Sequence, residues 1–126
     1  MKHILLVEDD PAVSYVLQRY LEKAGFAVLA ASGPREALGL FASSPVDLVV
    51  TDYRMPGMNG EEMLLQLRAG RPALPALIVS AYANELTLQI SGVPVLSKPV
   101  DAAELVGLVS NLLLDAETVA MNRPAG

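Results

Sequence analysis

Five short apolar runs divide this chain at fairly regular intervals. Each run holds three or four residues, mostly Val, Ile, Leu and Ala, which is too short for a helix and typical of strands buried on both faces of a sheet. The runs are residues 4–7, 28–31, 48–50, 77–79 and 93–96. Because the fifth run contains Pro94, which has no backbone N–H to donate, we predict that this strand lies at a sheet edge.

Apolar residues at helical spacing occupy most of the stretches between the runs. The predicted helices follow Asp10, follow Ser32, surround residues 63–67, surround residues 85–90 and follow Asp101. The helix around residues 85–90 has the poorest pattern, and we expect it to be short or irregular. Strands alternating with about five helices predict an α/β fold, a doubly wound five-stranded parallel sheet.

Two of these helices have recognisable start signals. Asp10 is a good N-cap residue and is followed by Pro11, which suits the first helical position. Asp101 and Glu104 have the spacing of a capping box at the start of the last helix. Beyond that helix we predict a polar tail or linker stub at residues 115–126. Residues 1–114 are then expected to form one domain, and we expect no separate output domain.

Polar side chains follow four of the five runs. They are Glu8, Asp9 and Asp10 after the first run, Asp52 after the third, Ser80 after the fourth and Lys98 after the fifth. Taken singly, the acidic residues and Ser80 are better explained as turn or solvated surface residues, whereas Lys98 is less easily explained in this way because its stem must pass buried neighbours. Parallel strands, however, bring their carboxyl ends to one edge of the sheet, where open α/β sheets bind ligands. We therefore predict one site at this edge.

The acidic members of this set point to a divalent cation. Crowded carboxylates repel one another unless a cation lies among them. Oxygen ligands suit Mg²⁺, which is held by few carboxylates and then recruits phosphate oxygens. Glu8, Asp9 and Asp52 are therefore candidate ligands for Mg²⁺ or Mn²⁺, whereas Asp10 mainly caps a helix.

Composition narrows the classes of function. The 126 residues are 52% hydrophobic, carry a net charge of −5 and include no cysteine. The acidic balance argues against nucleic acid and anionic membrane surfaces as partners, and the lack of cysteine excludes disulfides and thiolate metal sites. The first apolar run meets Glu8 too early for a signal peptide, and no run approaches the ~20 residues that span a bilayer. We expect a cytoplasmic protein.

In this order and context, the residues at the strand ends resemble the receiver domain of two-component response regulators. The resemblance covers about residues 2–114. It implies the flavodoxin-like strand order 2-1-3-4-5, which alternation alone leaves open. It assigns Asp52 as the phosphoacceptor, Glu8 and Asp9 as the acidic pair, and the backbone carbonyl of Arg54 as a further metal ligand. Lys98 and Ser80 would hold phosphoryl oxygens.

The family also implies a mechanism and partners. Asp52 would take the phosphoryl group from the phosphohistidine of a kinase or phosphotransfer protein with Mg²⁺ bound, and the product would change binding to a downstream protein. This is a signalling role, not that of a metabolic enzyme. The start at Met1 favours a stand-alone receiver, and the receiver portion of a hybrid histidine kinase is the alternative.

Other readings fit the residues less well. A haloacid dehalogenase-like phosphatase needs an acid two residues after the nucleophile, where this chain has Arg54. An FMN carrier needs a phosphate-binding loop after the first strand, where the acidic run would repel phosphate. A pseudo-receiver that only binds partners is disfavoured by the complete set of site residues.

Several features depart from the family or add to it. Ser80 and Lys98 are only 18 residues apart, and Val95 stands where an aromatic residue is common. Pro99 is expected to form the cis bond that the family uses to orient the preceding lysine. Two further pairs of residues suggest properties that the family pattern does not specify. Val106 and Leu113 suggest a dimer or kinase-docking face on the last helix, and bulky Arg54 and Tyr82 suggest slow hydrolysis of the aspartyl phosphate.

Overall fold

The computed structural model describes residues 1–121 and contains one five-stranded parallel sheet. Its strands are β1 (His3–Val7), β2 (Ala27–Ala31), β3 (Leu48–Asp52), β4 (Ala76–Ser80) and β5 (Val95–Ser97). They are arranged in the order β2-β1-β3-β4-β5, which confirms the predicted flavodoxin-like topology. β5 is an edge strand, as Pro94 predicted, although the strand itself begins one residue later.

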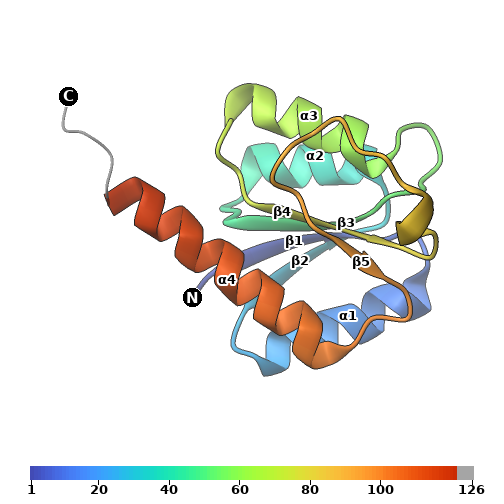
Figure 1. Cartoon of the computed structure of the whole chain (residues 1–126), viewed down its shortest axis with the longest axis horizontal. Helices are drawn as coiled ribbons and strands as arrows, with labels where there is room; N and C mark the ends of the chain where they lie inside the picture. The colour runs from blue at the N-terminus through green and yellow to red at the C-terminus, as the bar shows by residue number, and fades with distance from the viewer. Residues whose placement is uncertain (122–126) are drawn as a thin grey trace.

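In the described part of the chain, four α-helices cover the two faces of the sheet (Figure 1). They are α1 (Pro11–Lys23), α2 (Pro34–Ser43), α3 (Gly60–Gly70) and α4 (Ala102–Met121). α2 and α3 lie on one face and α1 and α4 on the other. Since right-handed crossovers place helices on both faces of a parallel sheet, β1, β3 and β4 are almost fully buried.

The structure shows the predicted Asp10 cap of α1 and the Asp101 half of the capping box predicted for α4. The Oδ1 atom of Asp10 accepts hydrogen bonds from the N–H groups of Ala12 and Val13. The Oδ2 atom of Asp101 accepts from the N–H of Glu104 at 3.0 Å. These bonds satisfy backbone donors that have no partner within the helix.

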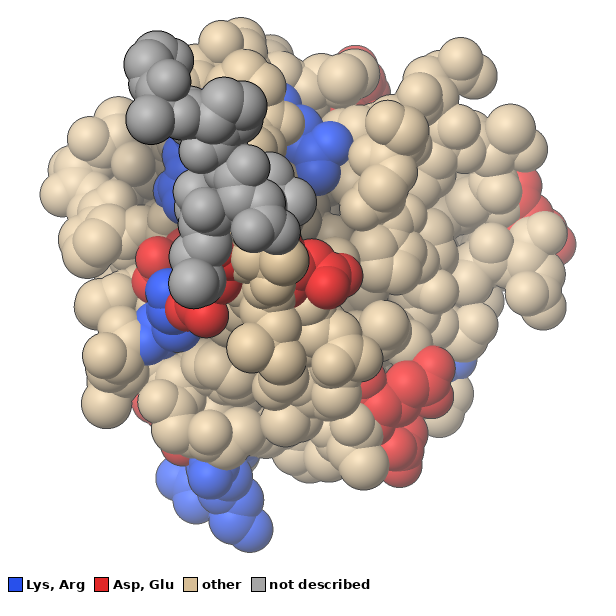
Figure 2. Space-filling model, turned by 60° about the vertical axis from the view of Figure 1, so that its left-hand side comes forward, with Lys and Arg blue, Asp and Glu red and all other residues tan. Residues whose placement is uncertain are grey.

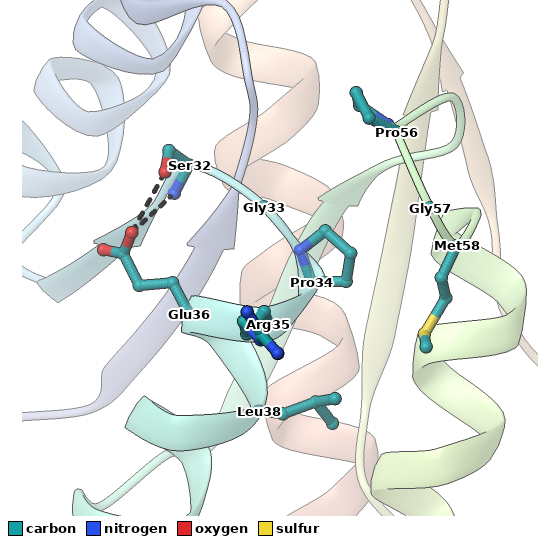
Figure 3. A pocket seen from close by; sticks show the side chains of 9 residues that line it. All are labelled: Ser32, Gly33, Pro34, Arg35, Glu36, Leu38, Pro56, Gly57 and Met58. Carbon is teal, nitrogen blue, oxygen red and sulfur yellow. Dashed lines mark hydrogen bonds between the residues drawn. The ribbon is translucent and has the colours of Figure 1, made fainter.

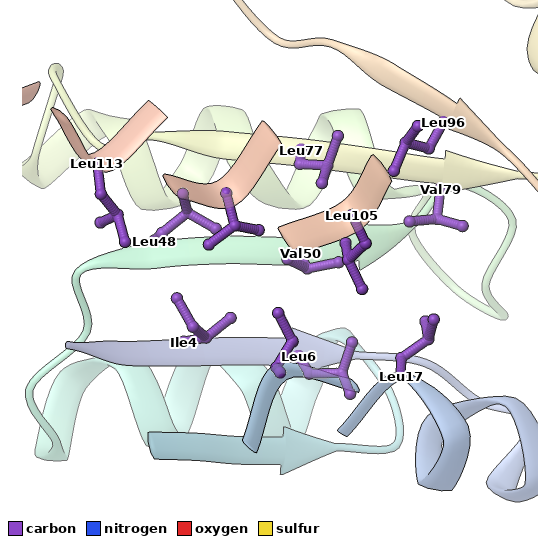
Figure 4. Packing of buried hydrophobic residues seen from close by; sticks show 12 residues of the cluster. Ile4, Leu6, Leu17, Leu48, Val50, Leu77, Val79, Leu96, Leu105 and Leu113 are labelled. Atoms are coloured by element: carbon purple, nitrogen blue, oxygen red, sulfur yellow. The ribbon is translucent and has the colours of Figure 1, made fainter. Parts of the chain in front are cut away.

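The core between the sheet and α1 and α4 corrects the prediction for Leu113. This side chain is only 7% exposed and points from α4 toward Leu48 and the sheet (Figure 4). Leu105, Val109 and Leu113 are four residues apart, so they share one face of the helix. The apolar surface that we predicted from Val106 and Leu113 therefore lacks Leu113, and Val106 is half-buried.

The segment between β4 and β5 confirms that the fourth predicted helix is short or irregular but differs from the prediction in where it lies. The helix expected at residues 85–90 is absent, and the segment contains only the 3₁₀ turn η1 (Ala83–Glu85). Leu86, Leu88 and Ile90 are half-buried, whereas the residues between them are exposed. This alternation has the period of an extended chain, which explains why no helix forms.

The polar tail predicted from residue 115 is helical as far as Met121, because α4 continues to that residue. The stretch from Asp115 to Met121 contains neither Gly nor Pro, so nothing in it ends a helix. Glu117 also forms an ion pair with Lys2 at 3.0 Å. The rest of the predicted tail, residues 122–126, lies outside the described residues.

Charged side chains on the face where the strands begin form small groups of both signs (Figure 2). Among the described residues, no continuous basic surface is visible on this face. Within residues 1–121, no helix is both long enough and apolar enough to cross a bilayer.

Candidate functional site

The carboxyl ends of β1, β3, β4 and β5 bring the predicted site residues together. These strand ends form the edge at the right of Figure 1. Asp52 is the last residue of β3 and is paired in register with Val79, next to Ser80 at the end of β4. The N–H of Lys98 donates to the backbone oxygen of Ser80 at 3.0 Å, which fixes the start of the β5–α4 loop beside β4.

Three carboxylates meet at this edge. One oxygen from each of Glu8, Asp9 and Asp52 lies within 4.8 Å of the others. Glu8 is 3% exposed and Asp52 is 9% exposed, whereas Asp9 lies at the surface. A small cluster of carboxylate oxygens that is open to solvent on one side fits a hard divalent cation that keeps several waters. The side chains predicted as metal ligands are therefore assembled.

Lys98 lies between two of these carboxylates. Its Nζ atom is 2.7 Å from Oε1 of Glu8 and 3.3 Å from Oδ2 of Asp52. The sequence did not predict the shorter contact with Glu8, because β5 lies three positions from β1 in the sheet and gives no local signal of it. The Lys98–Pro99 peptide bond is cis, as the resemblance implied.

The pKa values at this edge reflect burial in competition with charge pairing. Burial raises the pKa of the Glu8 carboxyl to about 6, although the hydrogen bond from Lys98 opposes the shift. Burial alone would lower the pKa of Lys98, but its hydrogen bond to Glu8 and the charges of both carboxylates outweigh burial and raise it. Lys98 is therefore positively charged at neutral pH, next to Asp52.

Ser80 is almost completely buried at the end of β4, with 2% of its surface exposed. Its Oγ atom accepts a hydrogen bond from the N–H of Tyr82 at 3.0 Å. A hydroxyl group can accept one bond and donate another. Ser80 can therefore donate its hydrogen to a ligand at the strand ends while it keeps this contact.

Arg54 lies in the β3–α3 loop, which is tied down on both sides of it. The N–H of Tyr53 donates to the oxygen of Val79 at 3.2 Å, and the N–H of Gly60 donates to the oxygen of Tyr53 at 2.8 Å. The guanidinium carbon of Arg54 lies 4.6 Å from the centroid of the Tyr82 ring, which is a cation–π contact. The sequence analysis singled out both residues but missed that they touch.

Gly60 is a residue of this site whose role the sequence analysis missed. A Cβ atom at this position would overlap the backbone oxygen of Asp52 and crowd Cγ2 of Thr51. The absence of a side chain thus lets the start of α3 pack directly on the end of β3. The available signal was that Gly60 directly follows Asn59, whose side chain caps α3.

Two grooves flank the strand ends. A groove of about 860 Å³ lies between the β2–α2 and β3–α3 loops and includes Pro34, Leu38 and Met58 (Figure 3). A second groove of about 490 Å³ lies between α1 and the β5–α4 loop and is lined by Val16 and Lys98 among others. The second groove is the one that directly adjoins a site residue.

Comparisons with known proteins agree with this geometry. A sequence model of the response regulator receiver domain matches residues 4–110. The sensory/regulatory protein RpfC of Xanthomonas campestris pv. campestris is 36% identical in an alignment 125 residues long, which covers 93% of this chain and 17% of RpfC. This chain thus spans less than a fifth of that relative.

Solved structures show the same fold. The receiver domain of the hybrid histidine kinase CckA has a TM-score of 0.77 and 34% identity, covering 88% of this chain and 98% of that one. The response regulator protein TrrA from Thermotoga maritima, in complex with Mg²⁺–BeF, has a TM-score of 0.78 and 29% identity. That match covers 89% of this chain and 99% of TrrA.

Proposed function

The chain belongs to the response regulator receiver domain family, and on this basis we propose that Asp52 accepts a phosphoryl group in a Mg²⁺-dependent reaction. The donor is the phosphohistidine of a histidine kinase or phosphotransfer protein. The observation that carries the proposal is the position of the Asp52 carboxylate, between the acidic pair Glu8–Asp9 and the ammonium group of Lys98. The protein acts as a phosphorelay signalling receiver and not as an enzyme of metabolism.

The chain's own residues account for most of the chemistry. An Oδ atom of Asp52 forms a bond to phosphorus while the phosphorus–nitrogen bond of phosphohistidine breaks and the imidazole leaves. Lys98 can move from Glu8 toward a phosphoryl oxygen and neutralise charge that develops there. When bound to Glu8, Asp9, Asp52 and the backbone carbonyl of Arg54, Mg²⁺ supplies further charge neutralisation. The solved Mg²⁺–BeF complex of TrrA supports this choice of cofactor.

The phosphorylated state would act through charge. Phosphorylation replaces one carboxylate charge with about −1.5 to −2 charges. A phosphoryl oxygen would attract the Ser80 hydroxyl and so shift the segment that begins at Tyr82. The apolar groove beside Lys98 offers a docking surface for the donor. The proposal concerns the receiver domain itself, whether it works alone or within a longer protein such as a hybrid kinase.

The proposed function is tested by incubating the protein with acetyl phosphate and Mg²⁺. We expect intact-protein mass to rise by one phosphoryl group, and EDTA to prevent the gain. Beryllofluoride with Mg²⁺ should bind at the same site. A protein that gains no mass under any divalent cation would contradict the proposal.

Asp9→Asn should weaken Mg²⁺ binding by more than about tenfold. Unit charges at 4 Å interact by about 4 kcal/mol at an effective dielectric constant of 20, so one lost carboxylate charge is a large loss. Calorimetric titration of Mg²⁺ measures the effect. Asp10→Asn is the matched control, because Asn also caps a helix and Asp10 lies outside the acidic cluster. Equal losses in both variants would argue against a specific ligand role for Asp9.

The aspartyl phosphate should be long-lived. Arg54 and Tyr82 form a contact beside the site, and neither is a carboxylate or amide that could orient an attacking water. The double variant Arg54→Asn with Tyr82→Glu should lose its phosphoryl group at least about tenfold faster, a small part of the 10²–10⁴-fold that a positioned general base can contribute. Phosphate release after removal of acetyl phosphate gives the rate.

The chain offers a matched control for this experiment. Arg19 and Tyr15 on α1 form a similar contact, with Arg19 Cζ 6.0 Å from the ring centroid. Arg19→Asn with Tyr15→Glu makes the same chemical changes away from Asp52. If both double variants release phosphate at the wild-type rate, Arg54 and Tyr82 do not shield the site.

A further inference from the structure

The segment that connects β4 to β5 is an extended chain that lies across α3. We call residues 81–94 the β4–β5 segment. In Figure 1 it passes from η1 in front of α3 and returns to β5. Leu86, Leu88 and Ile90 pack on the apolar cluster that includes Met63 and Leu64 of α3. The segment therefore covers apolar surface without regular backbone pairing of its own.

The two ends of the segment bond to β4, where the N–H of Tyr82 donates to Oγ of Ser80 and the N–H of Ile78 donates to the oxygen of Pro94. Between these ends, the hydrogen bonds to the rest of the domain come from two side chains of α3. One carboxylate oxygen of Glu61, Oε2, accepts from the N–H of Gln89 at 2.5 Å and from the N–H of Ile90 at 2.8 Å. Nη1 of Arg68 donates to the oxygen of Ser91 at 3.3 Å. Among the described residues, these are the hydrogen bonds that tie residues 86–93 to other elements.

Glu61 is an unusual residue for this position. It is 8% exposed in the first turn of α3, where a charged side chain is buried only if its charge is satisfied. Two backbone donors from the β4–β5 segment satisfy it. The bonds are charge-assisted and therefore stronger than ordinary backbone bonds. Glu61 thus holds two successive N–H groups in the middle of the segment, and Arg68 holds the neighbouring oxygen of Ser91.

The anchor and both ends of the segment are directly connected to the strand ends. Glu61 follows Gly60, whose backbone packs against the carbonyl of Asp52. At one end the segment follows Ser80, and at the other it leads through β5 to Lys98, whose N–H is bonded to Ser80. A change of charge at Asp52 therefore acts on the segment's start through Ser80 and on its anchor through the start of α3.

We propose that Glu61 is a positioning residue that holds the β4–β5 segment in the resting conformation, and that phosphorylation of Asp52 works against this anchor. The proposal rests on the phosphoacceptor function proposed above. In the phosphorylated state, Ser80 turns toward the phosphoryl group and the segment leaves the Glu61 carboxylate. The carboxylate then becomes hydrated, and the apolar residues of the segment become accessible.

The bonds to Glu61 and the binding of a ligand at Asp52 are coupled if the domain has a resting and an activated conformation. If activation has to break the bonds to Glu61, removing the carboxylate favours the activated conformation before any ligand binds. By linkage, a ligand that selects the activated state then binds more tightly. We expect beryllofluoride with Mg²⁺ to bind Glu61→Ala about tenfold more tightly than wild type, within the roughly 5–150-fold range of typical couplings.

The experiment combines hydrogen exchange with beryllofluoride titration. In resting Glu61→Ala, amide exchange at residues 86–91 should rise about tenfold or more, as expected for a lost local anchor. Beryllofluoride should raise exchange there in wild type and add little in Glu61→Ala. Glu61→Gln keeps the shape of the side chain and an acceptor oxygen, so its amide exchange at residues 86–91 should lie between those of wild type and Glu61→Ala. Glu22→Ala, an exposed acid on α1, is the charge-matched control.

The outcomes separate the two proposals. Wild type that binds no beryllofluoride would count against the phosphoacceptor function, and with it against the coupling. Wild type that binds, together with Glu61 variants of unchanged affinity, would overturn the coupling even if the segment exchanges faster, because Glu61 would then be only a structural anchor. If Glu61→Ala does not fold, amide exchange at residues 86–91 and beryllofluoride affinity are measured in Glu61→Gln, and unchanged affinity in that variant would overturn the coupling.

Discussion

Asp52→Asn will take up no phosphoryl group from acetyl phosphate and Mg²⁺ under conditions in which the wild type is fully modified. The substitution keeps the size and shape of the side chain but removes the anionic oxygen that attacks phosphorus. It also removes one of the three carboxylates that face the proposed metal site. Both losses act on the same reaction, so we expect the mass gain of one phosphoryl group to fall to background.

The fold should survive this substitution. Asp52 lies among like charges at the end of β3, so its neutralisation relieves repulsion from Glu8 and Asp9 even as it weakens the pairing with Lys98. Circular dichroism and thermal unfolding check that the variant is folded. Asp115→Asn, which removes a charge at an exposed position of α4, should be modified as fast as wild type. A stable mass gain in Asp52→Asn would mean that another residue is the acceptor.

The location of this site could be predicted from the sequence because two simple rules apply to it. Strands buried on both faces appear as short apolar runs, and parallel strands end at one edge of the sheet. Asp52, Ser80 and Lys98 follow three such runs, so their proximity required no knowledge of loop conformation. The strand order was different, since it came from the resemblance to receiver domains.

Features that depend on contacts distant in sequence could not be found in this way. The two bonds that satisfy Glu61 come from residues 28 and 29 positions later, and Lys98 reaches Glu8 across 90 positions. Within the segment around Leu86, Leu88 and Ile90, period-two alternation was present in the sequence and was overlooked in favour of a weak helical pattern. Extended segments without a partner strand are hard to recognise because no second strand confirms them.

The error at Leu113 has a different cause. The helical repeat from Leu105 through Val109 reaches Leu113, so the residue belongs to the core face by the same rule that identified the helix. The prediction placed Leu113 off the core face although it is four residues after Val109. The structure continues α4 through this region, and the periodicity holds there too.

Gly60→Ala should destabilise the domain by about 1–3 kcal/mol, the usual cost of adding an atom to a well-packed site. The new Cβ would overlap the backbone oxygen of Asp52. Since backbone atoms of β3 cannot rotate away like the end of a side chain, the start of α3 has to move instead. Thermal unfolding should show a decrease of roughly 5–10 °C in Tm.

Gly39→Ala is the matched control for this prediction. Gly39 lies inside α2, is exposed, and has no atom near the position of a new Cβ. There the same substitution should raise stability by up to about 1 kcal/mol through helix propensity alone. If the free energy of unfolding falls in Gly60→Ala and rises in Gly39→Ala, the destabilisation comes from the contact between α3 and β3.

Gly60→Ala should also be phosphorylated more slowly at temperatures where it remains folded, because the displaced helix carries the β3–α3 loop and the Arg54 carbonyl with it. If instead both variants gained stability, α3 would be free to move from β3 at no cost, and Gly60 could not transmit changes between Asp52 and Glu61.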